Sequence, residues 1–250
     1  MDAESRALTD KLRDIINGAE RIVFFGGAGV STESGIPDFR SSSGLYSTES
    51  EFGYSPEQML HERFFRTHTE EFYSYYRANM IYRDAEPNGA HKALAYLERQ
   101  GKLTAVITQN IDGLHQAAGS ENVIELHGTV HENYCTECGK SYDLDFIMDT
   151  DGVPLCECEG CRGVIKPKVT LYGEALDTAS FERASLAVGA ADVLIIGGTS
   201  LTVFPAAYLA ADFGGEHLII INKSPTPYDD EAELVIRAPI AEVLTEAVMP

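Results

Sequence analysis

The 250-residue sequence has no tryptophan, few basic residues and no long hydrophobic run. Nineteen lysines and arginines stand against 39 acidic residues, a formal net charge of −20, and no basic run is present to bind a phosphate backbone. We therefore expect no direct nucleic-acid binding. Apolar runs such as 193–196 and 218–221 are far shorter than the roughly 20 residues that cross a bilayer. The N-terminus, MDAESRALTD, has no apolar signal segment, so we expect a cytoplasmic protein without membrane contact.

Short apolar runs alternate with helix-like segments over most of the chain. Strands are expected at 21–25, 103–108, 123–126, 192–196, 217–221 and 234–236, and helices at 5–17, 89–100, 178–188, 203–213 and 240–248. Strands that alternate with helices are typical of a parallel sheet covered on both faces. The sequence therefore predicts an α/β fold with a Rossmann-like, doubly wound parallel sheet.

Two stretches interrupt this alternation. Residues 42–86 are rich in aromatic side chains without strand alternation, which predicts a helical insertion. Residues 131–166 hold all five cysteines and few apolar residues, so a cross-link or a bound metal, and not a hydrophobic core, must stabilise this segment. The Rossmann-like domain is then predicted to consist of residues 1–41, 87–130 and 167–250, with a small zinc-binding module at 131–166.

The cysteines form two CxxC pairs, Cys135 with Cys138 and Cys158 with Cys161. Their separation is typical of four thiolates around one tetrahedral zinc ion, whereas disulfides are disfavoured in a cytoplasmic protein. Cys156 offers an alternative third ligand through a CxC or Cx₄C spacing. We favour Cys158 and treat Cys156 as a spare thiol. Four sulfur ligands leave no open position for a catalytic water, so the zinc is expected to be structural.

A glycine-rich loop, Gly26-Gly27-Ala28-Gly29-Val30-Ser31, follows the first expected strand. Such a loop lets backbone N–H groups approach a pyrophosphate. The GxGxxG fingerprint of hydride-transferring enzymes requires glycine at position 32, where Thr32 stands, and the Gly-Lys-Ser/Thr ending of a P-loop is also absent. The loop alone is weak evidence for nucleotide binding, and it argues against a dehydrogenase.

The longer run at 27–40, GAGVSTESGIPDFR, closely resembles the nucleotide-binding signature of the sirtuins, the NAD-dependent protein-lysine deacylases, of bacterial type. Other segments resemble the remaining sirtuin motifs in order: TQNIDGLH at 108–115, ELHG at 125–128, the CxxC pairs, PKVTLYGE at 167–174, GGTSL at 197–201 and INK at 221–223. The resemblance covers residues 20–225. It implies transfer of the acetyl group of acetyl-lysine to ADP-ribose, with release of nicotinamide and O-acetyl-ADP-ribose. Protein ADP-ribosylation and removal of other acyl groups are alternatives on the same site.

The resemblance also implies roles for individual residues. His127 is expected to be the general base and Asn110 to orient a water molecule or the ribose, both as catalytic residues. Asp112 is expected to recognise the carboxamide of NAD. The complete set expected to bind NAD is Gly27, Ala28, Gly29, Thr32, Asp38, Phe39, Arg40, Gln109, Asn110, Asp112, Gly198, Thr199, Ser200, Asn222, Lys223 and Ile240.

The acetylated peptide is expected to bind as an added strand along Thr170, Leu171, Tyr172 and Gly173. Sirtuins that prefer acidic acyl groups have a tyrosine and an arginine three residues apart in the helical insertion. Here Tyr76 stands three residues after Tyr73, and Arg77 follows, displaced by roughly 100° around a helix. We therefore expect acetyl-lysine proteins or peptides as substrates, and a monomeric enzyme.

Overall fold

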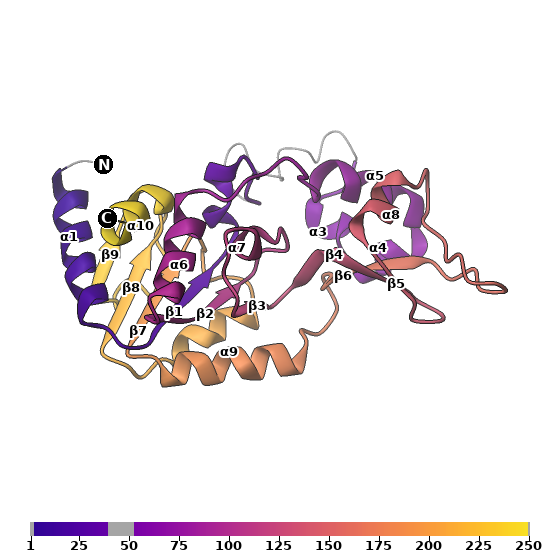
Figure 1. Ribbon diagram of the computed structural model, residues 1–250. Helices are drawn as coiled ribbons and strands as arrows, with labels where there is room; N and C mark the ends of the chain where they lie inside the picture. The colour runs from indigo at the N-terminus through magenta and orange to yellow at the C-terminus, as the bar shows by residue number, and fades with distance from the viewer. Residues whose placement is uncertain (1–2, 40–52, 250) are drawn as a thin grey trace.

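The computed structural model describes residues 3–39 and 53–249 (Figure 1). Six strands form a parallel sheet in the order β3-β2-β1-β7-β8-β9. Their bounds are β1 Ile22–Gly26, β2 Leu103–Thr108, β3 Val123–Glu125, β7 Val193–Gly197, β8 His217–Ile221 and β9 Leu234–Ile236. The helices beside this sheet are α1 Ala3–Gly18, α6 Gly89–Arg99, α7 Leu114–Ala117, α9 Thr178–Ala190 and α10 Ile240–Val248, with the 3₁₀ helices η1 Ala28–Val30, η2 Thr32–Ser34 and η4 Ala206–Asp212.

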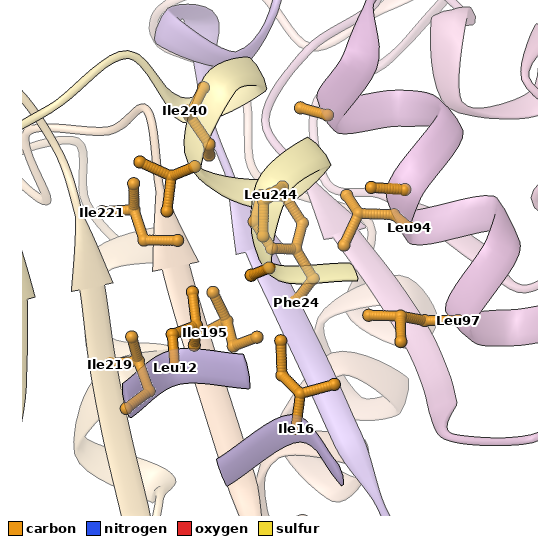
Figure 2. Close-up of a cluster of buried hydrophobic side chains, with 14 of the residues drawn as sticks. Leu12, Ile16, Phe24, Leu94, Leu97, Ile195, Ile219, Ile221, Ile240 and Leu244 are labelled. Carbon is orange, nitrogen blue, oxygen red and sulfur yellow. The ribbon is translucent and has the colours of Figure 1, made fainter. Parts of the chain in front are cut away.

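The central strands are hydrophobic along their whole length because both faces of the sheet are covered. In β1, Ile22 and Phe24 point into one core and Val23 and Phe25 into the other, as the two-residue period of a strand requires. The first core, drawn in Figure 2, lies under α1, α6 and α10, and the second lies under α9 and η4. The helices therefore form two layers around the sheet.

The direction in which successive strands are added to the sheet changes at β1. The chain proceeds outward from β1 through β2 to β3 and then returns to the other side of β1 at β7. Open parallel sheets bind ligands in the crevice at the carboxyl ends of the strands beside such a switch point. The glycine loop after β1 and the Gly197-Gly198 turn after β7 both lie at this place.

A second, three-stranded sheet lies at the other end of the molecule (Figure 1). Its antiparallel strands, in the order β5-β4-β6, are β4 Gly128–Cys135, β5 Ser141–Tyr142 and β6 Ile165–Val169, and the helices beside it are α3 Pro56–Met59, α4 Glu62–Thr67, α5 Thr69–Asn79 and α8 Leu144–Asp149. Aromatic side chains of α4 and α5 share one core with this sheet, as Phe65 and Tyr73 do with Tyr142 and Ile165. The helical insertion and the cysteine-containing segment therefore pack as one body.

The predicted α/β fold class is confirmed, including the doubly wound parallel sheet. One predicted element differs, because the segment expected as a helix at 203–213 forms the 3₁₀ helix η4 instead. The first part of the insertion predicted at 42–86 lies outside the described residues, and the domain boundaries stay predictions. Among the residues that the structure describes, no helix is long and apolar enough to span a bilayer.

Replacement of Leu244 by alanine should destabilise the fold, because its side chain is 0% exposed in the core beneath α10. We expect a loss of about 2–5 kcal/mol in the free energy of unfolding, measured by urea denaturation. Leu186→Ala is the matched control, since Leu186 is 74% exposed on α9. Equal losses in the two variants would contradict this description of the core.

Candidate active site

A cavity of about 930 Å³ opens at the carboxyl ends of β1, β2 and β7 and extends toward the small sheet. Residues from the glycine loop, from the turns after β2 and β7 and from the segment after β6 all line it. The cavity therefore lies between the two sheets, and both contribute side chains to it. Its size is within the usual range for a small-molecule or cofactor site.

Two glycines allow the loops after β1 and β7 to touch. The Gly29 N–H donates to the carbonyl oxygen of Gly198 at 2.8 Å. A Cβ added to Gly29 would lie 2.7 Å from the Gly198 Cα, and Gly198 itself has a φ of 60°. Side chains at either position would separate the loops, which explains glycine at both.

A chain of hydrogen bonds joins the glycine loop to the loop after β2. The Asn110 amide donates to Ser31 Oγ at 3.0 Å, and the Ser31 hydroxyl donates to Asp112 Oδ2 at 2.6 Å. The other carboxylate oxygen of Asp112 accepts the N–H of Leu114, the first residue of α7, at 2.9 Å. All three polar side chains line the cavity, and these bonds fix their orientation.

His127 lies in the two-residue link between β3 and β4, where the chain passes from one sheet to the other. Its Nδ1 lies 2.9 Å from the backbone oxygen of Gln109. A carbonyl can only accept a hydrogen bond, so Nδ1 carries the proton and Nε2 is the nitrogen that can accept one. Burial lowers the pKa of His127, with the Gln109 bond opposing the shift, so the ring is neutral at neutral pH.

Gly128, directly after His127, has a φ of 75° and lies against the backbone of β6. A Cβ at this position would be 1.9 Å from the Lys168 carbonyl oxygen, so only glycine fits. The His127 carbonyl oxygen accepts the Thr170 N–H at 2.9 Å. These contacts hold the histidine beside the segment that follows β6.

That segment, Thr170 to Gly173, forms one wall of the cavity. Backbone hydrogen bonds also join it to the helical insertion. The Tyr172 N–H donates to the carbonyl oxygen of Leu60, and the Tyr172 carbonyl oxygen accepts the Glu62 N–H at 2.9 Å. Tyr172 is 38% exposed, although it is a large aromatic residue. The wall thus pairs with the insertion at Tyr172, turns at Gly173 and keeps a solvent-accessible face.

Most of the residues predicted from the sequence come together here. Those that line the cavity are Ala28, Gly29, Asp38, Phe39, Gln109, Asn110, Asp112, His127, Thr170, Leu171, Tyr172, Gly173, Gly198, Thr199, Ser200 and Asn222. Arg40 lies outside the described residues.

Four predicted residues are not among those that line the cavity. Gly27 contacts the backbone after β7, and the Thr32 hydroxyl bonds back to the Gly29 oxygen at 3.0 Å. Lys223 is exposed beyond β8. Ile240 is 4% exposed in the core beneath α10 (Figure 2). Ile240 was predicted to bind NAD from the resemblance, but its side chain lies on the apolar side of α10 that faces the sheet.

Ser31 was missed as a site residue by the sequence prediction. It is 1% exposed, and its hydroxyl links Asn110 to Asp112. The available signal was its position at the end of the glycine loop. The partner it bonds is 81 residues away in sequence and becomes visible only in the fold.

Four cysteines gather at one end of the small sheet. The ligand atoms of Cys135, Cys138, Cys156 and Cys161 all lie within 4.8 Å of one another. Cys135 and Cys161 sulfurs are 3.6 Å apart, and those of Cys138 and Cys156 are 3.5 Å apart. A tetrahedron with Zn–S bonds of about 2.3 Å places its sulfurs about 3.8 Å apart, so the cluster fits zinc.

The prediction that Cys158 completes this cluster is corrected by the geometry, which groups Cys156 with the other three. Cys156 follows the bridge between Leu155 and Val164, and its N–H donates to the Gly163 oxygen at 2.9 Å. The Tyr142 hydroxyl donates to Cys156 Sγ at 3.2 Å and lowers the Cys156 pKa to about 6, which favours the metal-binding thiolate. The Cx₄C spacing therefore supplies the second pair.

The fold and site define a Rossmann-like α/β protein with a four-cysteine module. The Sir2 family profile matches residues 27–205. Similar proteins include the "NAD-dependent protein deacetylase" of Clostridium acetobutylicum, 54% identical over 94% of this chain and 96% of that protein, and that of Cutibacterium acnes, 48% identical over 96% and 99%. A solved structure described as "Sir2-p53 peptide-NAD+" has a TM-score of 0.83 at 40% identity and covers 94% of this chain and 95% of its own. The chain belongs to the Sir2 family.

The cysteine geometry makes a paired prediction. Cys156→Ser should lose most of its zinc and melt at a lower temperature, because the binding energy of a structural metal is also folding energy. Cys158→Ser should keep its zinc and its melting temperature, since Cys158 lies outside the cluster. Zinc per chain by atomic absorption and calorimetric melting check this. Loss of zinc in Cys158→Ser but not in Cys156→Ser would show that Cys158 is the zinc ligand.

Proposed function

We propose that the chain is an NAD-dependent protein-lysine deacetylase. The observation that carries the proposal is the position of His127 in a single cavity, between the hydrogen-bonded loops after β1 and β2 and the segment after β6. Such a cavity can hold a nucleotide on one side of the histidine and a peptide on the other. The relatives named NAD-dependent protein deacetylase support the same function.

Bound NAD would supply an ADP-ribose carbon that receives the acetyl oxygen as the bond to nicotinamide breaks. The chain's own residues bind and orient this group. Gln109 and Thr199, whose side chains are 3.4 Å apart, would hold the ribose from two loops. Asp112 would recognise the carboxamide, with its carboxylate held in place by Ser31 and the Leu114 N–H.

His127 would act as the general base through Nε2, taking a proton from a ribose hydroxyl. Its Nδ1–H is fixed by the Gln109 oxygen, which keeps the ring in the tautomer that a base needs. Phe39, half-buried at the edge of the aromatic core, would exclude water from the reacting carbon. Arg40 would contact the phosphates.

Zinc would be held by Cys135, Cys138, Cys156 and Cys161 and would supply no chemistry to the reaction. Four thiolates fill its coordination sphere, so its role would be to staple the loops of the small sheet. The Cys135 end of β4 pairs with β6, which leads into the wall of the cavity at Thr170. Zinc would thus stabilise the peptide-binding side.

Acetyl is the acyl group that the side chains around the cavity favour. Tyr73 and Tyr76 are buried within the aromatic core, and the Arg77 guanidinium donates to the carbonyl oxygens of Ile147 and Gly152 in the small-sheet module. Helix α5 therefore presents no cation to the cavity. Arg83 does line it, but it is paired with Asp145 at 2.5 Å.

Acetylated lysine in other proteins is the proposed substrate. Solved structures described as Sir2 with a p53 peptide and NAD+, or with a deacetylated p53 peptide and 3'-O-acetyl ADP ribose, support this class. The net charge of −20 is consistent with basic targets and opposes direct nucleic-acid binding. We further propose a cytoplasmic monomer.

His127→Ala should fold and bind NAD yet deacetylate an acetyl-lysine peptide about 10²- to 10⁴-fold more slowly, because the general base is lost. Mass spectrometry of the peptide and calorimetric titration with NAD measure the two properties. His217→Ala is the control, since His217 lies far from the cavity in an exposed contact with Glu233. Near-normal turnover by His127→Ala would refute the assignment of the base.

The pH dependence follows from the lowered pKa of His127. A base works unprotonated, so activity should be complete above this pKa and lost as the pH falls through it. We expect kcat/KM for the peptide to be constant well above the pKa of His127 and to fall as the pH drops through it, with a midpoint below the ordinary histidine value of 6.5. A midpoint above 6.5 would show that another group, or a charged His127, controls the rate.

A further inference from the structure

Lys166 is a buried lysine on β6, close to the cavity wall but not among the residues that line it. Only 10% of its side chain is exposed. Lysine is almost never fully buried unless its charge is paired, so its surroundings require an explanation. Its ammonium group also lies 5.9 Å from the centre of the Tyr134 ring on the neighbouring strand.

The hydrogen-bond and ion-pair partners of Lys166 all follow it within the next eight residues of the chain. Its Nζ donates to the carbonyl oxygens of Val169 at 3.0 Å and Pro167 at 3.3 Å. It also lies 3.1 Å from Glu174 Oε2. The same carboxylate oxygen accepts the Leu171 N–H at 2.8 Å. One ammonium and one carboxylate therefore close the chain from β6 to Glu174 into a compact loop.

This loop contains the wall of the cavity, Thr170 to Gly173. Its outer contacts are the Thr170 bond to His127 and the Tyr172 bonds to the insertion. The Lys166–Glu174 pair supplies the contacts on its inner side. Within the described part of the chain, no other group accepts the Leu171 N–H. Without the pair, this stretch would lose both its counter-charge and a backbone acceptor.

We propose that Lys166 and Glu174 are positioning residues for the peptide substrate. The pair holds Thr170 to Gly173, which ends in the turn closed by the Glu174 N–H and the Leu171 oxygen, in the shape that an acetyl-lysine peptide would join. This inference rests on the deacetylase function proposed above. The NAD side is held by separate bonds among Ser31, Asn110 and Asp112. Loss of the pair therefore acts on peptide binding and leaves NAD binding intact.

The chain offers a matched control two residues away. Lys168 on β6 and Glu132 on β4 are 2.6 Å apart, but both side chains are more than half exposed, at 61% and 62%. An exposed pair contributes little because water and salt screen it. Lys168→Met removes the same charge and side-chain type from β6 but leaves the Lys166–Glu174 pair and the Leu171 acceptor in place.

Steady-state kinetics with an acetyl-lysine peptide and NAD test the pair. Glu174→Gln, which keeps an acceptor for Leu171 but removes the counter-charge, should raise the peptide KM about tenfold or more. Its KM for NAD should stay within about twofold of that of the unaltered enzyme. Lys166→Met should act in the same direction, Lys166→Arg should restore much of the peptide KM, and Lys168→Met should match the unaltered enzyme.

The outcomes separate this inference from the function it rests on. If the unaltered enzyme does not deacetylate the peptide, the proposed function fails. If it does, and Glu174→Gln keeps a normal peptide KM, the positioning role is refuted. A parallel rise in both KM values, with a lowered melting temperature, would also refute it by showing a merely structural pair. Glu174→Gln and Lys166→Arg decide the matter even if Lys166→Met does not fold.

Discussion

The close contact between Gly128 and the backbone of Lys168 is the constraint on which the site depends. Because Gly128 has no side chain, β4 and β6 come together directly after the main sheet ends. His127 is thereby held at the junction, with its ring bonded to the Gln109 oxygen just after β2 and its carbonyl oxygen bonded to the Thr170 N–H just after β6. The general base proposed at this point would lie between a nucleotide on the parallel sheet and a peptide on the segment after β6.

Each side of the cavity is fixed by its own set of interactions. On the nucleotide side, two glycines bring the loops after β1 and β7 into contact, and the Ser31 hydroxyl joins Asn110 to Asp112. On the peptide side, the four-cysteine cluster, the shared aromatic core and the Lys166–Glu174 pair hold the small sheet and the loop it leads into. This separation explains how one protein can position two unlike substrates against one histidine.

The sequence predicts the fold well, because strands buried on both faces must be continuously apolar and those runs stand out at 103–108 and 217–221. The motifs likewise predict most of the cavity wall. Contacts between distant segments are harder to foresee. Ser31 gained its role from a partner on another loop, and Ile240 was expected to bind NAD although its side chain lies in the core beneath α10. The choice between Cys156 and Cys158 depended on the Leu155–Val164 bridge, which spacing alone does not reveal.

The central claim is that the acetyl group of a lysine passes to ADP-ribose in this cavity. Its most direct test follows an isotopically labelled acetyl-lysine peptide by mass spectrometry, with and without NAD. The account predicts unmodified lysine only when NAD is present, with nicotinamide released and the label recovered in O-acetyl-ADP-ribose. Label recovered as free acetate without NAD consumption, or ADP-ribose attached to an acetylated peptide that is otherwise unchanged, would contradict it.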